Sequence, residues 1–118
     1  MSDAAEKSVF SRIVDREIPA DIVAETETLI AFRDIQPQAP VHVLVVPKTA
    51  EHRNVSELAK GDPALLAELI GLAQDIADRE CGGEFRLVFN TGERGGQTIF
   101  HVHAHVLGGD LSEASLGQ

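Results

Sequence analysis

The stretch from Phe100 to Val106 constrains the fold most, because histidine alternates there with apolar residues. Three of the five histidines in the chain, His101, His103 and His105, stand at every second position. Successive side chains of a strand point to opposite faces, so the three imidazoles would share one face, roughly 6.6 Å apart. The residues between them would enter a core. A helix would spread the imidazoles around its axis, so the pattern predicts a strand.

The remaining sequence predicts two helices and further strands. Apolar residues at helical spacing predict a helix over 8–16, with Ser8 as its cap. A long amphipathic helix is predicted to start at Asp62 and Pro63 and to end at Gly82. Further strands are predicted at 21–25, 28–32, 42–46 and 85–89. Strands on both sides of one long helix indicate an α+β fold, an antiparallel sheet covered on one face by that helix.

Charge and composition exclude several classes of function. The 118 residues carry a formal net charge of -9, which repels polyanions, so neither nucleic acid nor a membrane surface is an expected partner. No apolar run is long enough to span a bilayer, and the polar first seven residues do not resemble a secretory signal. The single Cys81 cannot form an internal disulfide, so we expect a reducing, cytoplasmic setting.

Three imidazoles on one face could serve two kinds of chemistry. They could hold zinc, with His42 as a fourth ligand, although adjacent residues of one strand diverge and zinc ligands usually come from different strands. Alternatively, a neutral histidine could attack phosphorus and form a covalent intermediate. Its second ring nitrogen then needs an acceptor, commonly a backbone carbonyl. A neighbouring histidine could protonate the leaving group, and the glycine-rich loop 90–98 could supply N–H donors to the phosphate.

Asn90, the run 95–98 and the segment 101–109 together resemble the signature of the histidine triad (HIT) family. The sequence is most similar to the branch of histidine triad nucleotide-binding proteins, the purine nucleoside phosphoramidases. Further matching segments are 10–13, 17–20, 31–40 and 42–48. The resemblance implies one HIT domain over 1–118, with a core of about 8–109 and tails at 1–7 and 110–118. It also implies a two-fold homodimer, with the long helix and a strand of each subunit at the interface.

The same resemblance implies a hydrolase for the P–N bond of purine nucleoside 5′-phosphoramidates, such as AMP-lysine or adenosine phosphoramidate. It implies that His103 is the nucleophile and becomes transiently nucleotidylated. His105 would lie by the leaving group and the α-phosphate. His42 would orient His103 through the hydrogen-bond network, and His101 would be more structural, helping to position the pocket. The implied phosphate and leaving-group residues are Asn90, Gly96, Gln97 and Thr98.

The resemblance places Asp34 at the ribose, where a carboxylate accepts hydrogen bonds from hydroxyl groups. The implied walls of the base pocket are Phe10, Ile13, Ile18, Phe32, Ile35 and Leu44. Two alternatives remain open here. Asp34 could be an acidic turn residue, and Phe10, Ile13 and Leu44 could equally belong to the core.

Two departures from the family pattern affect cofactors and specificity. Many bacterial members hold a structural zinc with Cys-x-x-Cys in the first helix and a later histidine, where this chain has Ser8, Ser11 and Ala50. Those residues do not form a zinc-ligand set, so we expect neither metal nor cofactor. The tail 110–118 lacks the aromatic and proline residues of eukaryotic members, which leaves the preferred amine open. Alternative functions are a dinucleoside polyphosphate hydrolase or nucleotidyl transferase, and a nucleotide-binding adaptor with incidental catalysis.

Overall fold

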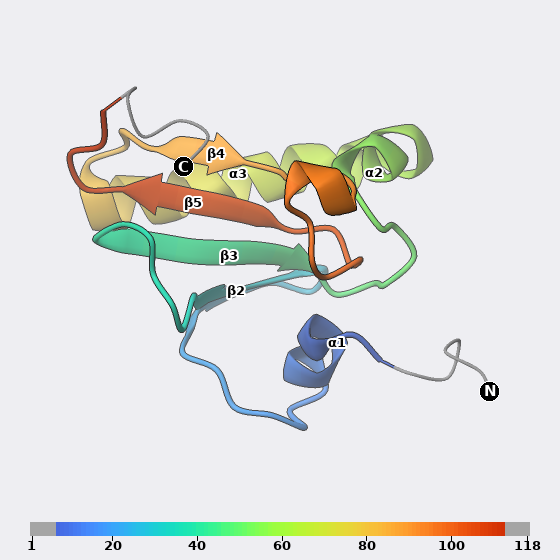
Figure 1. Cartoon of the computed structure of the whole chain (residues 1–118). Coiled ribbons are helices and arrows are strands. Elements are labelled where there is room, and N and C mark those ends of the chain that lie inside the picture. The colour runs from blue at the N-terminus through green and yellow to red at the C-terminus, as the bar shows by residue number, and fades with distance from the viewer. Residues whose placement is uncertain (1–6, 113–118) are drawn as a thin grey trace.

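A computed structural model describes residues 7–112 of the chain, with five strands in one antiparallel sheet (Figure 1). The strand order is β1-β2-β3-β5-β4, so β3 lies at the centre. The strands are β1 (Ile22–Glu25), β2 (Leu29–Arg33), β3 (Val41–Pro47), β4 (Arg86–Val88) and β5 (Ala104–Gly108). β3 pairs with β5 so that Leu44 lies opposite His105. This register makes His42, two residues before Leu44, a diagonal neighbour of His105 on the same face.

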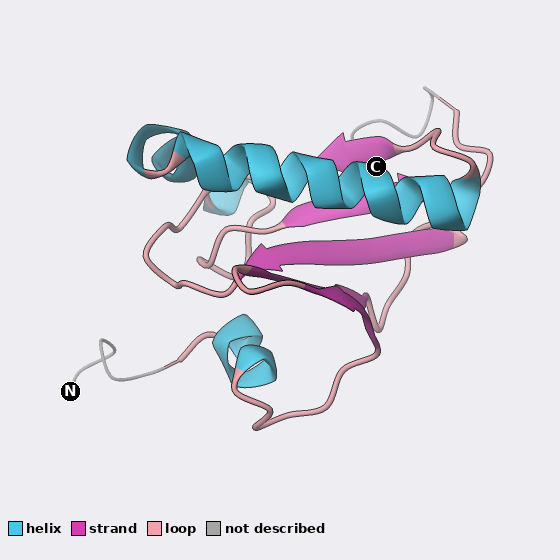
Figure 2. Ribbon diagram, turned by 180° about the vertical axis from the view of Figure 1, so that it is seen from behind, coloured by secondary structure: helices cyan, strands magenta, loops and turns pink. Residues whose placement is uncertain are grey.

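The long helix α3 (Pro63–Cys81) covers one face of the sheet (Figure 2). It begins where expected because the Asp62 side chain accepts a hydrogen bond from the Leu65 N–H at 3.1 Å. It ends at Gly82, which adopts a left-handed conformation with φ 70°. One core cluster joins the buried side of α3 to the sheet, through Leu65, Leu69, Ala73, Ile76, Val43, Val45, Val102, Ala104 and Val106. The predicted α+β architecture, with a helix on one face, is confirmed.

A short helix, α1 (Val9–Val14), packs on the opposite face. Its buried Phe10 and Ile13 join Ile30, Phe32, Leu44 and Val46 in a second cluster. These β2 and β3 residues alternate with those that face α3, as the period of a strand requires. Ser8 caps α1, and its hydroxyl accepts a hydrogen bond from the Ser11 N–H at 2.9 Å. A third helix, α2 (Val55–Gly61), precedes α3, and a 3-10 turn, η2 (Glu93–Gly95), lies in the glycine-rich loop.

The histidine segment enters the sheet later than predicted, because the ladder of β5 begins at Ala104. The Val102 N–H donates to the His52 carbonyl at 3.0 Å and not to a neighbouring strand. The alternation nevertheless persists, since Val102 packs in the α3 cluster while His101 and His103 contact the Phe10 ring on the other face. None of the helices described within residues 7–112 has the length and hydropathy of a membrane span.

Candidate active site

His103 adopts the state that a nitrogen nucleophile needs. Its Nδ1 lies 2.8 Å from the His101 carbonyl oxygen, and a carbonyl only accepts, so Nδ1–H donates and the lone pair resides on Nε2. Burial lowers the pKa of His103, with the bond to the His101 carbonyl acting in the opposite direction. The imidazole is therefore neutral at pH 7, and its Nε2 has no protein partner within residues 7–112.

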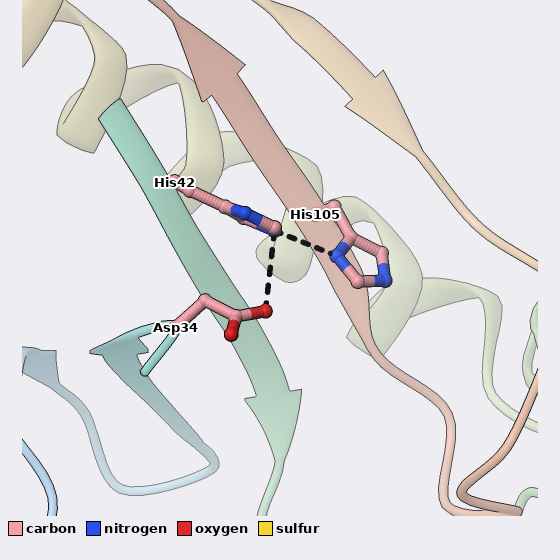
Figure 3. A group of neighbouring side chains, drawn as sticks. All are labelled: Asp34, His42 and His105. Carbon is pink, nitrogen blue, oxygen red and sulfur yellow. Dashed lines mark hydrogen bonds and ion pairs between the residues drawn. The ribbon is translucent and has the colours of Figure 1, made fainter. Parts of the chain in front are cut away.

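His42 and His105 form a directed pair on the same face (Figure 3). The Gln38 N–H donates to His42 Nδ1 at 3.0 Å, so the proton of the neutral His42 ring is on Nε2. His42 Nε2 lies 3.0 Å from His105 Nδ1 and donates to it. The proton of His105 is consequently on Nε2. The direct hydrogen bond of His42 goes to His105, and the ring centroid of His105 lies 5.1 Å from that of His103. The expected orientation of His103 by His42 remains a prediction and would act through His105.

His105 Nε2–H is a buried donor without a protein partner in the described part of the chain. Figure 3 shows this nitrogen on the side of the ring away from His42. Burial, reinforced by the neighbouring His103 and His42, lowers the pKa of His105 to about 4. A buried donor left unpaired is costly, so this N–H is ready for an acceptor that a ligand brings.

Asp34 serves a turn and also faces the site. Its Oδ1 accepts a hydrogen bond from the Gln36 N–H at 2.8 Å, which is the turn interaction considered from the sequence. Its Oδ2 lies 3.4 Å from His42 Nε2 (Figure 3). Burial lowers the pKa of His42, and the nearby Asp34 carboxylate opposes that change.

Asp34, His42 and His105 have potential ligand atoms within 4.8 Å of one another, but their hydrogen bonds do not suit a metal. His42 Nδ1 already accepts the Gln38 N–H. A metal on His42 Nε2 would therefore require an imidazolate or the loss of that hydrogen bond. The absence of a metal from the working protein remains a prediction.

His101 is committed to structural contacts, as its expected role requires. The side chain is 1% exposed. Its Nε2 lies 2.7 Å from the Pro47 carbonyl oxygen and its Nδ1 lies 2.7 Å from Ser8 Oγ. Both ring nitrogens are thus used by the protein, and neither is available to a ligand.

The Gln97 side chain is hydrogen-bonded within and beside the glycine-rich loop. It is therefore not available to hold phosphate, and that expectation is corrected. Its side chain is 2% exposed. The side-chain oxygen accepts from the Gly92 N–H, and the side-chain nitrogen donates to the carbonyls of Arg53 and Ile99. The backbone N–H groups of residues 95–97 also donate within the loop, to the carbonyls of Gly92 and Glu93. These three N–H groups therefore do not form the phosphate cradle that the glycines suggested.

The side chains of Asn90 and Thr98 remain open to a ligand, whereas the Gly96 N–H is used by the Glu93 carbonyl. Gly96 has φ 94°, and a Cβ on it would lie 3.7 Å from Asn90 Cγ, so the Asn90 side chain stands beside this turn. Thr98 is exposed. Within residues 7–112, neither the Asn90 amide nor the Thr98 hydroxyl has a protein partner.

The apolar residues predicted around the base separate into two groups. Phe10, Ile13, Phe32 and Leu44 belong to the α1 cluster, with Ile18 packed against it. The core interpretation therefore holds for Phe10, Ile13 and Leu44. The cluster also adjoins the site, since the Phe10 ring centroid lies 4.8 Å from that of His103. Ile35, in contrast, is 93% exposed and lies outside the cluster.

Some partners of the histidines were missed in the sequence. The Gln38 N–H and the Pro47 carbonyl are backbone groups. Every residue type except proline has both groups, so the sequence does not indicate which of them contact a histidine. The sequence indicates Ser8 as a helix cap, whereas the structure also makes it a partner of His101. The hydroxyl-bearing residues at positions 8 and 11 are the only sequence feature that points to this contact.

Comparisons with known proteins agree with this architecture. The HIT domain family model matches residues 15–111. An uncharacterized HIT-like protein of Synechocystis is 49% identical over 89% of this chain and 92% of its own length. The purine nucleoside phosphoramidase of Escherichia coli K12 is 42% identical over 89% of each chain. The crystal structure of a HIT family hydrolase from Legionella pneumophila has a TM-score of 0.87 and 39% identity, covering 94% of this chain and 100% of that one. The chain therefore belongs to the HIT domain family.

Proposed function

We propose that this protein hydrolyses the P–N bond of purine nucleoside 5′-phosphoramidates, such as AMP-lysine or adenosine phosphoramidate. The proposal rests on one observation: a histidine nitrogen with a free lone pair lies near a histidine nitrogen with a free proton. His103 offers an unprotonated Nε2, and His105 offers a protonated one, with ring centroids 5.1 Å apart. The 42% identity to a purine nucleoside phosphoramidase supports this choice of substrate class.

The reaction would proceed by two displacements at phosphorus. His103 Nε2 attacks the phosphorus atom, a P–N bond to the ring forms, and the P–N bond to the amine breaks. The departing amine takes up one proton from solvent. Water then attacks phosphorus, the bond to His103 breaks, the 5′-monophosphate leaves, and the water returns one proton to solvent. The His103 ring is positively charged while nucleotidylated, which strengthens its Nδ1–H bond to the His101 carbonyl.

The remaining site residues would bind the substrate. His105 Nε2–H would donate to a phosphoryl oxygen or to the leaving nitrogen as charge develops there. Asn90 and Thr98 would contact the phosphate and leaving group beside Gly96. The Asp34 carboxylate would accept from the ribose hydroxyls. The half-buried Ile18 and the exposed Ile35 would contact the purine, for which exposed apolar side chains provide a surface. Phe32 is buried in the α1 cluster and would support that surface from below.

We also propose that two copies pair through β4 and α3. β4 ends the sheet of described strands, and the edge strand of a sheet can pair with a strand of another copy. Ile70, on α3, is 44% exposed. Sedimentation equilibrium should give the mass of two chains, and Ile70→Glu should weaken the association. A wild-type mass of one chain would exclude this arrangement.

Substrate comparison tests the proposed reaction. Wild-type protein should release AMP from AMP-lysine much faster than it cleaves a diadenosine polyphosphate. His103→Ala should lose at least about a thousandfold in kcat, because the attacking group is gone, while AMP still binds in calorimetry. His52→Ala is the matched control, since His52 lies outside the site, and should retain activity.

The other outcomes identify the alternatives. Faster cleavage of the polyphosphate would favour the dinucleoside polyphosphate hydrolase. AMP binding with only trace turnover on every substrate would favour the adaptor. Near-normal turnover by His103→Ala would exclude the assigned nucleophile.

A further inference from the structure

The tautomer of His101 determines the direction of its hydrogen bond with Ser8. His101 Nε2 lies 2.7 Å from the Pro47 carbonyl oxygen, which only accepts, so Nε2 carries the proton. Burial lowers the pKa of His101, so the ring is neutral and Nδ1 has a lone pair. Ser8 Oγ lies 2.7 Å from that nitrogen. The hydroxyl of Ser8 is therefore the donor.

The Ser8 oxygen acts in two directions at once. It accepts the Ser11 N–H at 2.9 Å as the cap of α1, and it donates its single proton to His101. The Ser11 hydroxyl lies farther from His101 Nδ1, at 3.5 Å. The start of α1 thus contacts the histidine segment through the Ser8 hydroxyl, with the Ser11 hydroxyl as a longer second contact.

His101 in turn supplies the contact that sets the His103 tautomer. Its carbonyl oxygen accepts His103 Nδ1–H at 2.8 Å. His101 precedes the ladder of β5, which begins at Ala104, so strand pairing does not fix its backbone. The ring of His101 is instead held at both nitrogens, by Ser8 on one side and by Pro47 at the end of β3 on the other.

We propose that Ser8 is a positioning residue for the nucleophile, acting through His101 without touching the substrate. Its effect on turnover rests on the proposed function. Without the Ser8 proton, His101 Nδ1 keeps only the more distant Ser11 hydroxyl, at 3.5 Å, as a donor. The ring is then held firmly at Nε2 alone and can reorient. The carbonyl that holds His103 Nδ1–H then loses its support. A part of the His103 population would carry its proton on Nε2, where it cannot attack phosphorus.

Three substitutions separate this role from helix capping. Ser8→Gly removes the donor, while glycine remains an acceptable N-cap. Ser8→Thr keeps the hydroxyl. Ser11→Ala removes the neighbouring hydroxyl but leaves the Ser11 N–H and the bond from Ser8 to His101 in place. We expect kcat to fall about tenfold in Ser8→Gly, KM to stay within about twofold, and Ser8→Thr and Ser11→Ala to stay within about threefold of wild type.

Several results would overturn the proposal. They are an unchanged kcat in Ser8→Gly, a KM effect without a kcat effect, a failure of Ser8→Thr to preserve the rate, and an equal loss in Ser11→Ala. Should Ser8→Gly not fold, Ser8→Ala provides the same test. Alanine has no proton to give to His101 and no acceptor for the Ser11 N–H, so denaturant unfolding measures the capping loss separately. The kcat of the folded Ser8→Ala protein should fall too, and an unchanged kcat would count against the proposal.

Nitrogen-15 NMR of the imidazole rings tests the inference without any substrate. Wild type should show protonated Nε2 in His101 and protonated Nδ1 in His103. Ser8→Gly should convert His103 to a mixture of tautomers, and Ser11→Ala should not. Unchanged His103 signals in Ser8→Gly would overturn the inference. If the signals change but wild-type protein cleaves no phosphoramidate, the proposed function fails and the positioning of His103 by Ser8 stands.

Discussion

The two histidines closest to the proposed chemistry differ in which ring nitrogen carries the proton. The Nδ1 atom of His103 faces a carbonyl, which forces the proton onto Nδ1. The Nδ1 atom of His105 faces the donating Nε2 of His42, which forces the proton onto the far nitrogen. His103 therefore offers a ligand a lone pair, whereas His105, two positions later, offers it a hydrogen-bond donor.

This assignment predicts a covalent adduct on His103 Nε2. Acid-labile phosphoramidate bonds to histidine should be trapped when working enzyme is quenched in alkali and digested for mass spectrometry. A substrate with a chiral thiophosphoryl group should react with retention, because two in-line displacements invert phosphorus twice. Overall inversion would mean that water attacks the substrate directly, and it would exclude the intermediate.

The lowered pKa of His105 predicts a loss of stability in acid. In the unfolded chain the ring titrates near its usual value of 6.5, and in the folded protein near 4. The unfolded state therefore binds the proton first, so the unfolding free energy should fall as the pH drops from 6.5 to 4. Each pKa unit corresponds to about 1.4 kcal/mol, so this residue contributes roughly 3 kcal/mol to the fall.

Urea unfolding at several pH values between 7.5 and 4 measures that fall. His105→Gln should show a shallower pH dependence than wild type. The fall should not vanish, because burial also lowers the pKa of His42, His101 and His103 in the same direction. Identical slopes for His105→Gln and wild type would contradict the shift assigned to His105.

At the scale of elements, the start of α3 is set by one side chain. The Asp62 carboxylate accepts the Leu65 N–H, and α3 packs on the sheet face opposite the histidines. Asp62→Ala should therefore lower the unfolding free energy by about 1 kcal/mol and leave kcat unchanged. Denaturant unfolding and a rate assay measure the two effects. Asp62→Ser retains an acceptor and should recover most of the stability; if it were as unstable as Asp62→Ala, the cap would not explain the loss.

Elements whose limits depend on local residues were predictable, and those that depend on distant backbone groups were not. The caps Ser8 and Asp62 and the terminator Gly82 are local signals, and they locate α1 and α3. The late start of β5 arises because the His52 carbonyl takes the Val102 N–H. Nothing in the sequence around position 102 indicates that partner.

The same distinction applies to the candidate site. Alternation correctly put the imidazoles on one face, because it follows from strand geometry alone. The predicted role of Gln97 failed because the Arg53 carbonyl and the Gly92 N–H occupy its amide. The predicted glycine cradle failed because the loop folds into the turn η2 and consumes its own N–H groups.

At the scale of the whole molecule, the acidic charge predicts how salt affects catalysis. The chain carries a net charge of -9, and its site histidines are neutral at pH 7, so an anionic nucleotide approaches against a repulsive field. Salt screens that field. Raising the ionic strength from about 20 mM to about 300 mM should therefore raise kcat/KM roughly threefold. A decrease would indicate that cationic groups near the site attract the substrate.

Helices cover the two faces of the sheet to different extents. Nineteen residues of α3 lie over one face, whereas six residues of α1 lie over part of the other, as the views from front and back show (Figures 1 and 2). Among residues 7–112, no helix other than α1 covers this second face, and a bound nucleotide would cover a further part of it. Because a ligand that binds only the folded protein stabilises it, tighter binding would give a larger rise in melting temperature. A collection of nucleosides and phosphoramidates could be ranked by that rise, with base and leaving group varied independently, before any product is measured.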